Sequence, residues 1–302
     1  MKEKTDVAII GAGPAGLSAA IWCTDLGLET IVLESADRAG GQLHRIHNPV
    51  SNYPGFESVS GSELAERFAV KDRFPIEHGR QLSSFGLDPI SLTLADGKVI
   101  RPRAVIIATG VRRRALGVPG ENEFAGRGII DSGARDPSAA AGKRVVVVGG
   151  GDAAAENALI LGEFAESVAV VHRRDSLSAR PEFVERISKS SNIKLRFAST
   201  VESFNGNSRL ESVTVRTSAD EASDIPADLA LIRIGVVPNS EPFSGFLRMD
   251  QAGYIDVDRE CRTSVPGIYA AGDVANPVSP TIATAAGMGA TAAKAVYTWL
   301  NT

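Results

Sequence analysis

The stretch DVAIIGAGPAGLSAA, residues 6–20, decides the fold, because an apolar strand runs directly into a G-x-G-x-x-G turn and then into a helix. We predict a strand at Asp6–Ile10, a helix at Leu17–Gly27 and a second strand at Glu29–Glu34. The glycines permit a tight turn and let a phosphate approach backbone N–H groups at the positive end of the helix. The stretch therefore predicts a β-α-β unit that binds a nucleotide through Gly11, Gly13, Pro14, Ala15 and Gly16.

Glu34 ends the second predicted strand, 23 residues after Gly11. A carboxylate at this place in a β-α-β unit accepts a hydrogen bond from the ribose 2′-OH of an adenosine. The first unit is therefore predicted to bind an adenosine whose ribose carries no 2′-phosphate.

A second β-α-β unit has a valine-rich strand at Arg144–Val148, the turn GGGDAA at 149–154, a helix at Ala154–Gly162 and a strand at Val168–Val171. The position 23 residues after the first glycine of this turn is a histidine, and two arginines follow it. A carboxylate there would repel a 2′-phosphate, whereas guanidinium groups bind one bidentately. We therefore predict an NADP site that contains Gly150, Gly151, Asp152, Ala153, His172, Arg173 and Arg174.

Near the end of the chain, the apolar strand 267–271 closes with Gly272-Asp273, and an alanine-rich helix is predicted at Thr281–Leu300. An aspartate at a strand end can accept a hydrogen bond from a sugar or ribityl hydroxyl, and a helix N-terminus can stabilise negative charge on a flavin. The alternative is a strand and a cover helix with a surface aspartate, and these residues alone leave both open.

The length of 302 residues corresponds to about two domains at roughly 150 residues each. A net charge of −4 gives no electrostatic basis for binding nucleic acid or an anionic membrane. Two cysteines, Cys23 and Cys261, exclude a disulfide framework and a four-cysteine zinc site, and we expect no metal. The uncharged stretch 7–23 mimics a signal peptide, but its glycines and Pro14 break a continuous apolar helix, so we expect a cytoplasmic protein.

These residues resemble the low-molecular-weight thioredoxin reductase family of FAD and NADPH flavoproteins, and the resemblance covers essentially the whole chain. Six motifs match the family in order: Gly11–Gly16, Gly40-Gly41-Gln42-Leu43, Asn52-Tyr53-Pro54-Gly55, Ala108-Thr109-Gly110, Gly149–Asp152 with His172–Asp175, and Gly272-Asp273-Val274. The resemblance implies an α/β fold with two doubly wound, Rossmann-like nucleotide-binding domains. An NADPH-binding domain at 112–238 would be inserted into a discontinuous FAD-binding domain at 1–111 and 239–302.

The resemblance also implies a homodimer and assigns further cofactor-binding residues. On the FAD side these are Gly41, Gln42, Asn52, Thr109, Gly110, Gly272, Asp273, Thr281, Ile282 and Ala283. On the NADPH side they are Ile234 and Gly235, in addition to the residues of the second turn.

Three departures from the family pattern bear on function. Counting back from Gly149 without a gap, the two redox cysteines of the family fall on Ser132 and Arg135, and the acid that donates a proton falls on Asp136. A serine oxygen can neither form the redox thiolate nor accept electrons as a disulfide. In addition, Pro280-Thr281-Ile282 replaces an Arg-Gln-Ala run. A family arginine falls on Ser178 while Arg180 stands two residues later, and we include Arg180 in the NADP site on the strength of this resemblance.

We therefore expect an NAD(P)H-linked FAD oxidoreductase in which hydride passes to the flavin and electrons then leave it directly. The acceptor would be ferredoxin, flavodoxin or a small molecule. One alternative is a thioredoxin-type disulfide reductase that uses cysteines of its partner. Another is a flavoprotein scaffold or sensor without turnover, since fold does not imply function.

Overall fold

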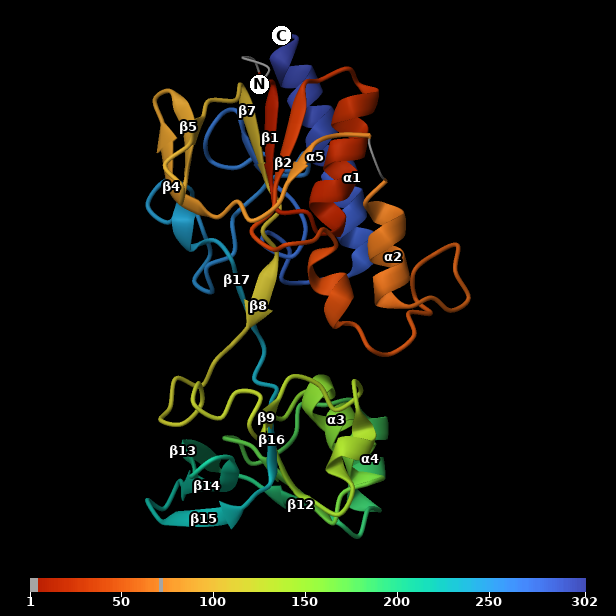
Figure 1. The fold of residues 1–302 in the computed structure, drawn as a ribbon, viewed down its shortest axis with the longest axis vertical. Coiled ribbons are helices and arrows are strands. Elements are labelled where there is room, and N and C mark those ends of the chain that lie inside the picture. The colour runs from red at the N-terminus through yellow and green to blue at the C-terminus, as the bar shows by residue number, and fades with distance from the viewer. Residues whose placement is uncertain (1–4, 71–72) are drawn as a thin grey trace. The chain divides into compact units, whose positions relative to one another are not determined.

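The computed structural model describes residues 5–70 and 73–302. The chain forms two compact units, which can be followed in Figure 1: unit 1 is Met1–Arg112 with Val237–Thr302, and unit 2 is Arg113–Val236. The chain passes between the units along β8 (Val111–Arg113) and β17 (Val236–Pro238), which pair as a two-stranded sheet. The predicted domain junctions lie within two residues of these boundaries.

Unit 1 is built on a parallel sheet with the strand order β18-β7-β1-β2-β3. Its strands are β1 (Val7–Ile10), β2 (Thr30–Leu33), β3 (Ile76–Glu77), β7 (Ala104–Ile107) and β18 (Ile268–Ala270). Helix α1 (Pro14–Asp25) crosses from β1 to β2, whereas β7 pairs with the opposite side of β1. The direction of winding therefore reverses at β1, and ligands of open parallel sheets bind at such a switch point.

Both faces of this sheet are buried, as its consecutive apolar residues require. Ile9 and Ile106 pack with α1 and α5 (Ile282–Leu300), which lie side by side in Figure 1. Ile107 packs on the opposite face with Phe85. Phe85 belongs to the antiparallel sheet of β4 (Leu82–Leu87), β5 (Ile90–Leu94) and β6 (Val99–Ile100), which covers that face.

Small residues bring α1 and α5 into contact at backbone distance. A Cβ atom on Gly289 of α5 would lie 2.1 Å from the carbonyl oxygen of Ala15 in α1, so only glycine fits there. Ser18 of α1 donates a hydrogen bond to the carbonyl of Ala286 at 2.7 Å. The two long helices of unit 1 are therefore locked together along their sides. The short elements of this unit are α2 (Gly61–Phe68), η1 (Gly41–Arg45) and η3 (Glu241–Phe243).

Unit 2 repeats the architecture with a parallel sheet in the order β12-β11-β10-β16-β9. Its strands are β9 (Ile129–Ile130), β10 (Arg144–Val148), β11 (Ser167–Val171), β12 (Ile193–Arg196) and β16 (Leu229–Ile232). One face packs against α3 (Asp152–Gly162) and α4 (Pro181–Ser188), and η2 (Pro137–Ala140) contributes Ala140 to this core. The other face packs against the antiparallel strands β13 (Ser199–Gly206), β14 (Leu210–Thr217) and β15 (Ala222–Pro226).

The α/β fold class with two doubly wound sheets is confirmed. Helix α1 begins at Pro14 rather than at the predicted Leu17, because proline is accommodated in the first turn of a helix. Helix α3 likewise begins at Asp152, directly after its glycine turn, rather than at Ala154.

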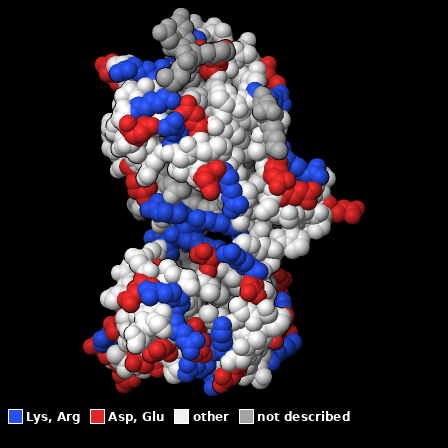
Figure 2. All heavy atoms as spheres, in the orientation of Figure 1, with Lys and Arg blue, Asp and Glu red and all other residues white. Residues whose placement is uncertain are grey.

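The surface of unit 2 carries both signs of charge. On the face that Figure 2 shows, Lys and Arg side chains are interspersed with Asp and Glu side chains over this unit. Among the helices of the described residues, none is long and apolar enough to cross a membrane.

Candidate functional site

A cleft of about 690 Å³ opens in unit 1 at the carboxyl ends of the parallel strands. All residues described as lining it belong to unit 1. They include twelve of the predicted cofactor-binding residues: Gly11, Gly13, Pro14, Ala15, Glu34, Gly41, Gln42, Thr109, Gly110, Asp273, Thr281 and Ile282. The tertiary structure thus brings together motifs from both ends of the chain.

The glycine turn after β1 is shaped to leave one side open. Gly11 has φ +103°, and a Cβ there would lie 2.4 Å from the carbonyl oxygen of Ala108. A Cβ on Gly16 would lie 1.9 Å from the carbonyl oxygen of Gly11, whereas one on Gly13 would meet nothing within 4 Å. Helix α1 starts at Pro14 with no acidic residue in its first turn. The open side at Gly13 and the positive helix end therefore fit a pyrophosphate.

Glu34 is held in place before any ligand arrives. Its carboxylate accepts hydrogen bonds from the backbone N–H of Ala12 at 2.7 Å and of Ala36 at 2.8 Å, and the residue is 8% exposed. The oxygen that accepts from Ala36 also accepts from the Ser35 hydroxyl at 3.3 Å, so one lone pair remains, on the oxygen that accepts from Ala12. Glu34 lines the cleft, and this remaining acceptor fits a ribose hydroxyl.

The other end of the cleft combines Asp273, Gln42 and the first turn of α5. Burial raises the pKa of Asp273. The side-chain amide of Gln42 donates to the carbonyl of Val111 at 2.5 Å, which fixes its orientation. The Thr281 hydroxyl caps α5 by accepting from the N–H of Thr284 at 3.2 Å, and the first turn of α5 carries no acidic residue. A positive helix end and a half-buried carboxylate acceptor fit a flavin with its ribityl chain.

Four predicted FAD-side residues lie outside the set described as lining the cleft. Gly272 is buried with φ +79° and packs against Ala15, and Gly16 supports the turn from behind. Asn52 and Ala283 are exposed, Asn52 in the loop after η1 and Ala283 in the first turn of α5.

The second glycine turn, in unit 2, is packed against His172. A Cβ on Gly150 would lie 2.4 Å from the His172 ring, so the ring covers this glycine. Burial and the charges of Arg174 and Arg173 lower the pKa of His172, so the ring is neutral at pH 7. Arg173 and Arg174 themselves are exposed. The guanidinium groups of Arg173 and Arg174 are therefore accessible at the position where the sequence predicts a 2′-phosphate.

Arg180 is paired with an acidic residue at the start of α3, next to the second glycine turn. Its Nε lies 3.0 Å from a carboxylate oxygen of Asp152, and its guanidinium also lies 2.9 Å from Glu182 and stacks over the ring of Phe183. Two residues that the sequence assigned to NADPH, Asp152 and Arg180, thus bind each other. Further along the chain, Gly235 has φ +96° with open space at its Cβ position, and Ile234 packs beside the core.

Ser132 and Arg135 occupy a loop of unit 2 beside α3. The N–H of Gly133 between them donates to the buried side chain of Asn157 at 2.9 Å, which ties the loop to the helix. Arg135 and Asp136 are exposed. The Asp136 carboxylate accepts from the hydroxyl of Ser138 at 2.8 Å beside the start of η2, so its contact is local to this loop.

The two cysteines are free thiols in the core of unit 1. Cys23 is 0% exposed and Cys261 is 3% exposed. Burial raises the pKa of Cys23 to about 12 and that of Cys261 to about 11. The thiolate is the nucleophile in disulfide exchange, so neither cysteine is reactive near neutral pH.

Several residues line the cleft without belonging to any of the predicted motifs. Arg80, Gln81 and Leu82 come from the segment after β3, and Arg45 comes from η1. Strand β3 has two residues, too few for a periodic signal, so no pattern could have placed this segment beside Glu34.

Comparison with known proteins agrees with this geometry. The chain matches the family described as pyridine nucleotide-disulphide oxidoreductase over residues 5–290. A thioredoxin reductase of Bacillus subtilis is 38% identical over 301 residues, which cover 98% of this chain and 95% of that protein. A thioredoxin reductase of Treponema pallidum is 35% identical, with 100% and 99% covered.

Solved structures show the same likeness. The crystal structure of Lactococcus lactis thioredoxin reductase has a TM-score of 0.86 at 32% identity and covers 99% of both chains. That of the T. acidophilum enzyme has a TM-score of 0.83 at 32% identity and covers 100% of both chains. The chain therefore belongs to the pyridine nucleotide-disulphide oxidoreductase family, as a thioredoxin reductase-like NAD(P)H-dependent flavin oxidoreductase whose cofactors are FAD and NADPH.

Proposed function

We propose that this enzyme passes electrons from its flavin directly to an acceptor, without an internal dithiol. The observation that carries the proposal is the pair Ser132 and Arg135 at the positions of the redox cysteines. The buried thiols of Cys23 and Cys261, with pKa values raised to about 12 and about 11, support it because neither can take over the relay.

The residues of unit 1 would hold FAD along the cleft. Bound FAD supplies the two-electron chemistry, in which hydride is accepted from a nicotinamide and the electrons are passed on. The N–H groups at the start of α1 would bind the pyrophosphate, and Glu34 would accept hydrogen bonds from the adenosine ribose. Asp273 would accept from a ribityl hydroxyl, and the N-terminus of α5 at Thr281 would stabilise negative charge on the flavin.

The residues of unit 2 would hold NADPH. The turn at Gly150 and Gly151 would bind the pyrophosphate at the start of α3, while Arg173 and Arg174 would bind the 2′-phosphate. The neutral His172 ring would keep the turn rigid by packing on Gly150, and it adds no charge that competes for the phosphate.

The acceptor we propose is an electron-transfer protein of the ferredoxin or flavodoxin type or a small oxidant such as a quinone. A second candidate is a thioredoxin-like protein or other disulfide that brings the cysteines itself, which the names of the relatives favour. Cytoplasmic location and a homodimer belong to the same proposal.

The test is anaerobic reduction followed by an acceptor panel. Adding NADPH to the yellow holoenzyme should bleach the flavin band within seconds, and ferredoxin, flavodoxin or a quinone should restore it. Restoration by oxidised thioredoxin alone would support the second candidate instead. A flavin that stays oxidised with NADPH and NADH would overturn the proposal and indicate a scaffold without turnover.

A further inference from the structure

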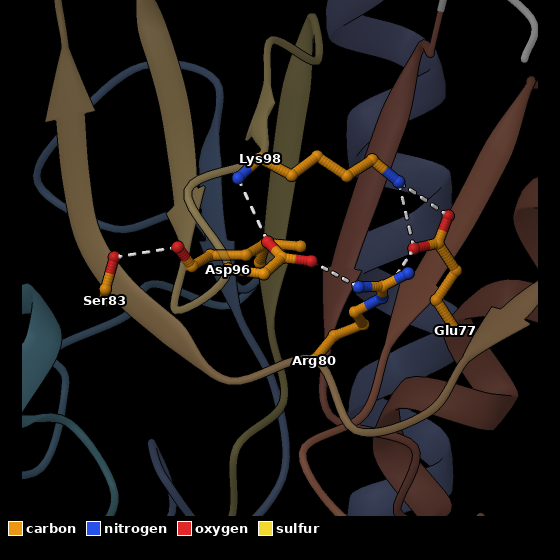
Figure 3. Close-up of polar contacts among 6 residues, drawn as sticks. Glu77, Arg80, Ser83, Asp96 and Lys98 are labelled. Carbon is orange, nitrogen blue, oxygen red and sulfur yellow. Dashed lines mark hydrogen bonds and ion pairs between the residues drawn. The ribbon is translucent and has the colours of Figure 1, made fainter.

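An ion-pair network stands at the wall of the cleft beside Glu34 and is not part of any nucleotide-binding motif. Figure 3 shows Glu77, Arg80, Asp96 and Lys98 joined in this network. Arg80 is the member that lines the cleft. Its side chain is 34% exposed, so part of it remains available to a ligand.

The guanidinium of Arg80 is held from two sides. Its Nε lies 2.9 Å from Glu77, and a terminal nitrogen lies 2.5 Å from Asp96; Figure 3 shows the two carboxylates reaching it from opposite sides. Lys98 in turn lies 3.0 Å from both carboxylate oxygens of Glu77. Two cations and two anions therefore balance, and Arg80 is fixed in one orientation before a ligand binds.

The backbone places this guanidinium next to the predicted ribose site. The N–H of Arg80 donates to the carbonyl of Glu34 at 2.7 Å, and the N–H of Glu34 donates to the carbonyl of Glu77 at 2.9 Å. One residue earlier, the N–H of Gly79 donates to the carbonyl of Ala36 at 3.0 Å. The segment 77–80 is thus paired with the end of β2, and Arg80 adjoins the wall just beyond the carboxylate that would bind ribose.

We propose that Arg80 binds the adenine ring of FAD. In an adenosine the base is attached directly to the ribose, so a ribose at Glu34 brings the base to the wall formed by Ala36, Arg80 and Gln81. A planar guanidinium stacks on an aromatic face and donates hydrogen bonds to ring nitrogens, which an ammonium group cannot do in the same geometry. Clamping by Glu77 and Asp96 lowers the entropy lost on binding. This inference rests on the FAD site and not on the proposed acceptor.

The competing explanation is that the network only stabilises the fold. Partly exposed ion pairs contribute little to stability. In that case, loss of Arg80 would change the unfolding temperature and would weaken ligands of the cleft without regard to their chemistry. A role in adenine binding would instead weaken only ligands that contain adenine.

The experiment therefore compares three ligands on the flavin-free protein: FAD, FMN, which lacks the adenosine, and AMP, which lacks the flavin. Fluorescence titration of Arg80→Ala should show FAD and AMP binding weakened about tenfold and FMN binding unchanged. Arg80→Lys should resemble Arg80→Ala, because charge without the planar group does not restore stacking. The matched control is Arg248→Ala, which removes a guanidinium paired with Asp256 on the surface of the same unit and should change none of the three affinities.

Equal weakening of FAD and FMN, or no change in either, would overturn the assignment. If Arg80→Ala does not fold, Asp96→Asn serves in its place, since it releases one side of the clamp and leaves the guanidinium present; it should weaken FAD and AMP about threefold and leave FMN unchanged. These titrations contain no NADPH and no acceptor. A wrong acceptor assignment therefore cannot produce either outcome.

Discussion

The carboxylate of Glu34 and the backbone N–H of Ala12 are joined by a hydrogen bond of 2.7 Å. Glu34, the residue directly after β2, therefore also stabilises the glycine turn that follows β1. A buried N–H without an acceptor is costly, so the Glu34 carboxylate stabilises the conformation of the turn. It would also accept a hydrogen bond from the ribose. A change at this position should affect both the apoprotein and its affinity for FAD.

Replacing Glu34 should release the flavin. Glu34→Arg places a cation where the ribose and two backbone N–H groups need an acceptor, and we expect colourless protein that stays colourless with added FAD. Glu34→Gln keeps one acceptor oxygen and should weaken FAD at least about tenfold. The measurements are flavin content and the FAD dissociation constant, with Glu63→Gln, at an exposed side chain of α2, as the control. Yellow Glu34→Arg protein with full flavin content would contradict the predicted ribose site.

The preference for NADPH over NADH should depend on Arg173 and Arg174. Each charge-assisted contact to a 2′-phosphate contributes roughly 1.5–3 kcal/mol. Replacing both arginines with alanine should therefore weaken NADPH on the order of 100-fold or more and leave NADH nearly unchanged. Dissociation constants of both nucleotides, measured on the holoenzyme, test this.

The matched control is Arg180→Ala, because Arg180 is paired with Asp152 and Glu182. It should change NADPH affinity by less than about threefold. A larger loss with Arg180→Ala than with the double variant would show that Arg180 leaves its partners to bind the phosphate.

Removing both cysteines should leave catalysis intact. Cys23→Ala with Cys261→Ala deletes thiols whose pKa values lie at about 12 and about 11, so NADPH-driven flavin reduction and acceptor turnover should stay within about twofold of the wild type. Thermal unfolding of the same protein reports any loss of packing. Disulfide reductase activity that disappears in this variant would reveal a working thiol pair.

Introducing a dithiol is the complementary test. Ser132→Cys with Arg135→Cys restores the family spacing in the loop tied to Asn157. On partial reduction we expect a long-wavelength absorption band from a thiolate beside the flavin. A folded, yellow double variant without this band would show that the segment does not take the place of the family dithiol.

Asp273 should link pH to the stability of the apoprotein. Burial raises its pKa above the ordinary 3.8, so the folded state holds a proton to higher pH than the unfolded state does. The contribution of this group to stability is therefore greatest below pH 3.8 and is lost as pH rises through the folded-state pKa.

Asp273→Asn removes this dependence. We expect the variant apoprotein to unfold at higher temperature than the wild type at pH 7, yet to bind FAD more weakly, because an amide is a poorer acceptor for a ribityl hydroxyl. Thermal unfolding across pH and flavin titration measure the two effects, with the exposed Asp37→Asn as control. A lower unfolding temperature at pH 7 would contradict the assigned burial cost.

The predictable part of this protein lies in its β-α-β units. The turns at Gly11 and Gly149 follow apolar strands and precede helices, and both features are local in the chain, so spacing alone places them. The same is true of Glu34, since a residue at the end of the second strand has a defined place relative to the turn. The starts of α1 and α3 were predicted three and two residues late, because the polar N–H end of a helix leaves no hydrophobic period to detect.

Sequence alone is enough to identify the two nucleotide-binding turns, the carboxylate of one, the arginines of the other, and the absence of a Cys-x-x-Cys pair. The position of Arg80 beside Glu34 and the pairing of Arg180 with Asp152 become known only from the folded chain. The reason is physical. A turn motif depends on backbone conformation within a few residues, whereas these contacts and the pKa values that follow from burial depend on which strands and helices pack together across the chain.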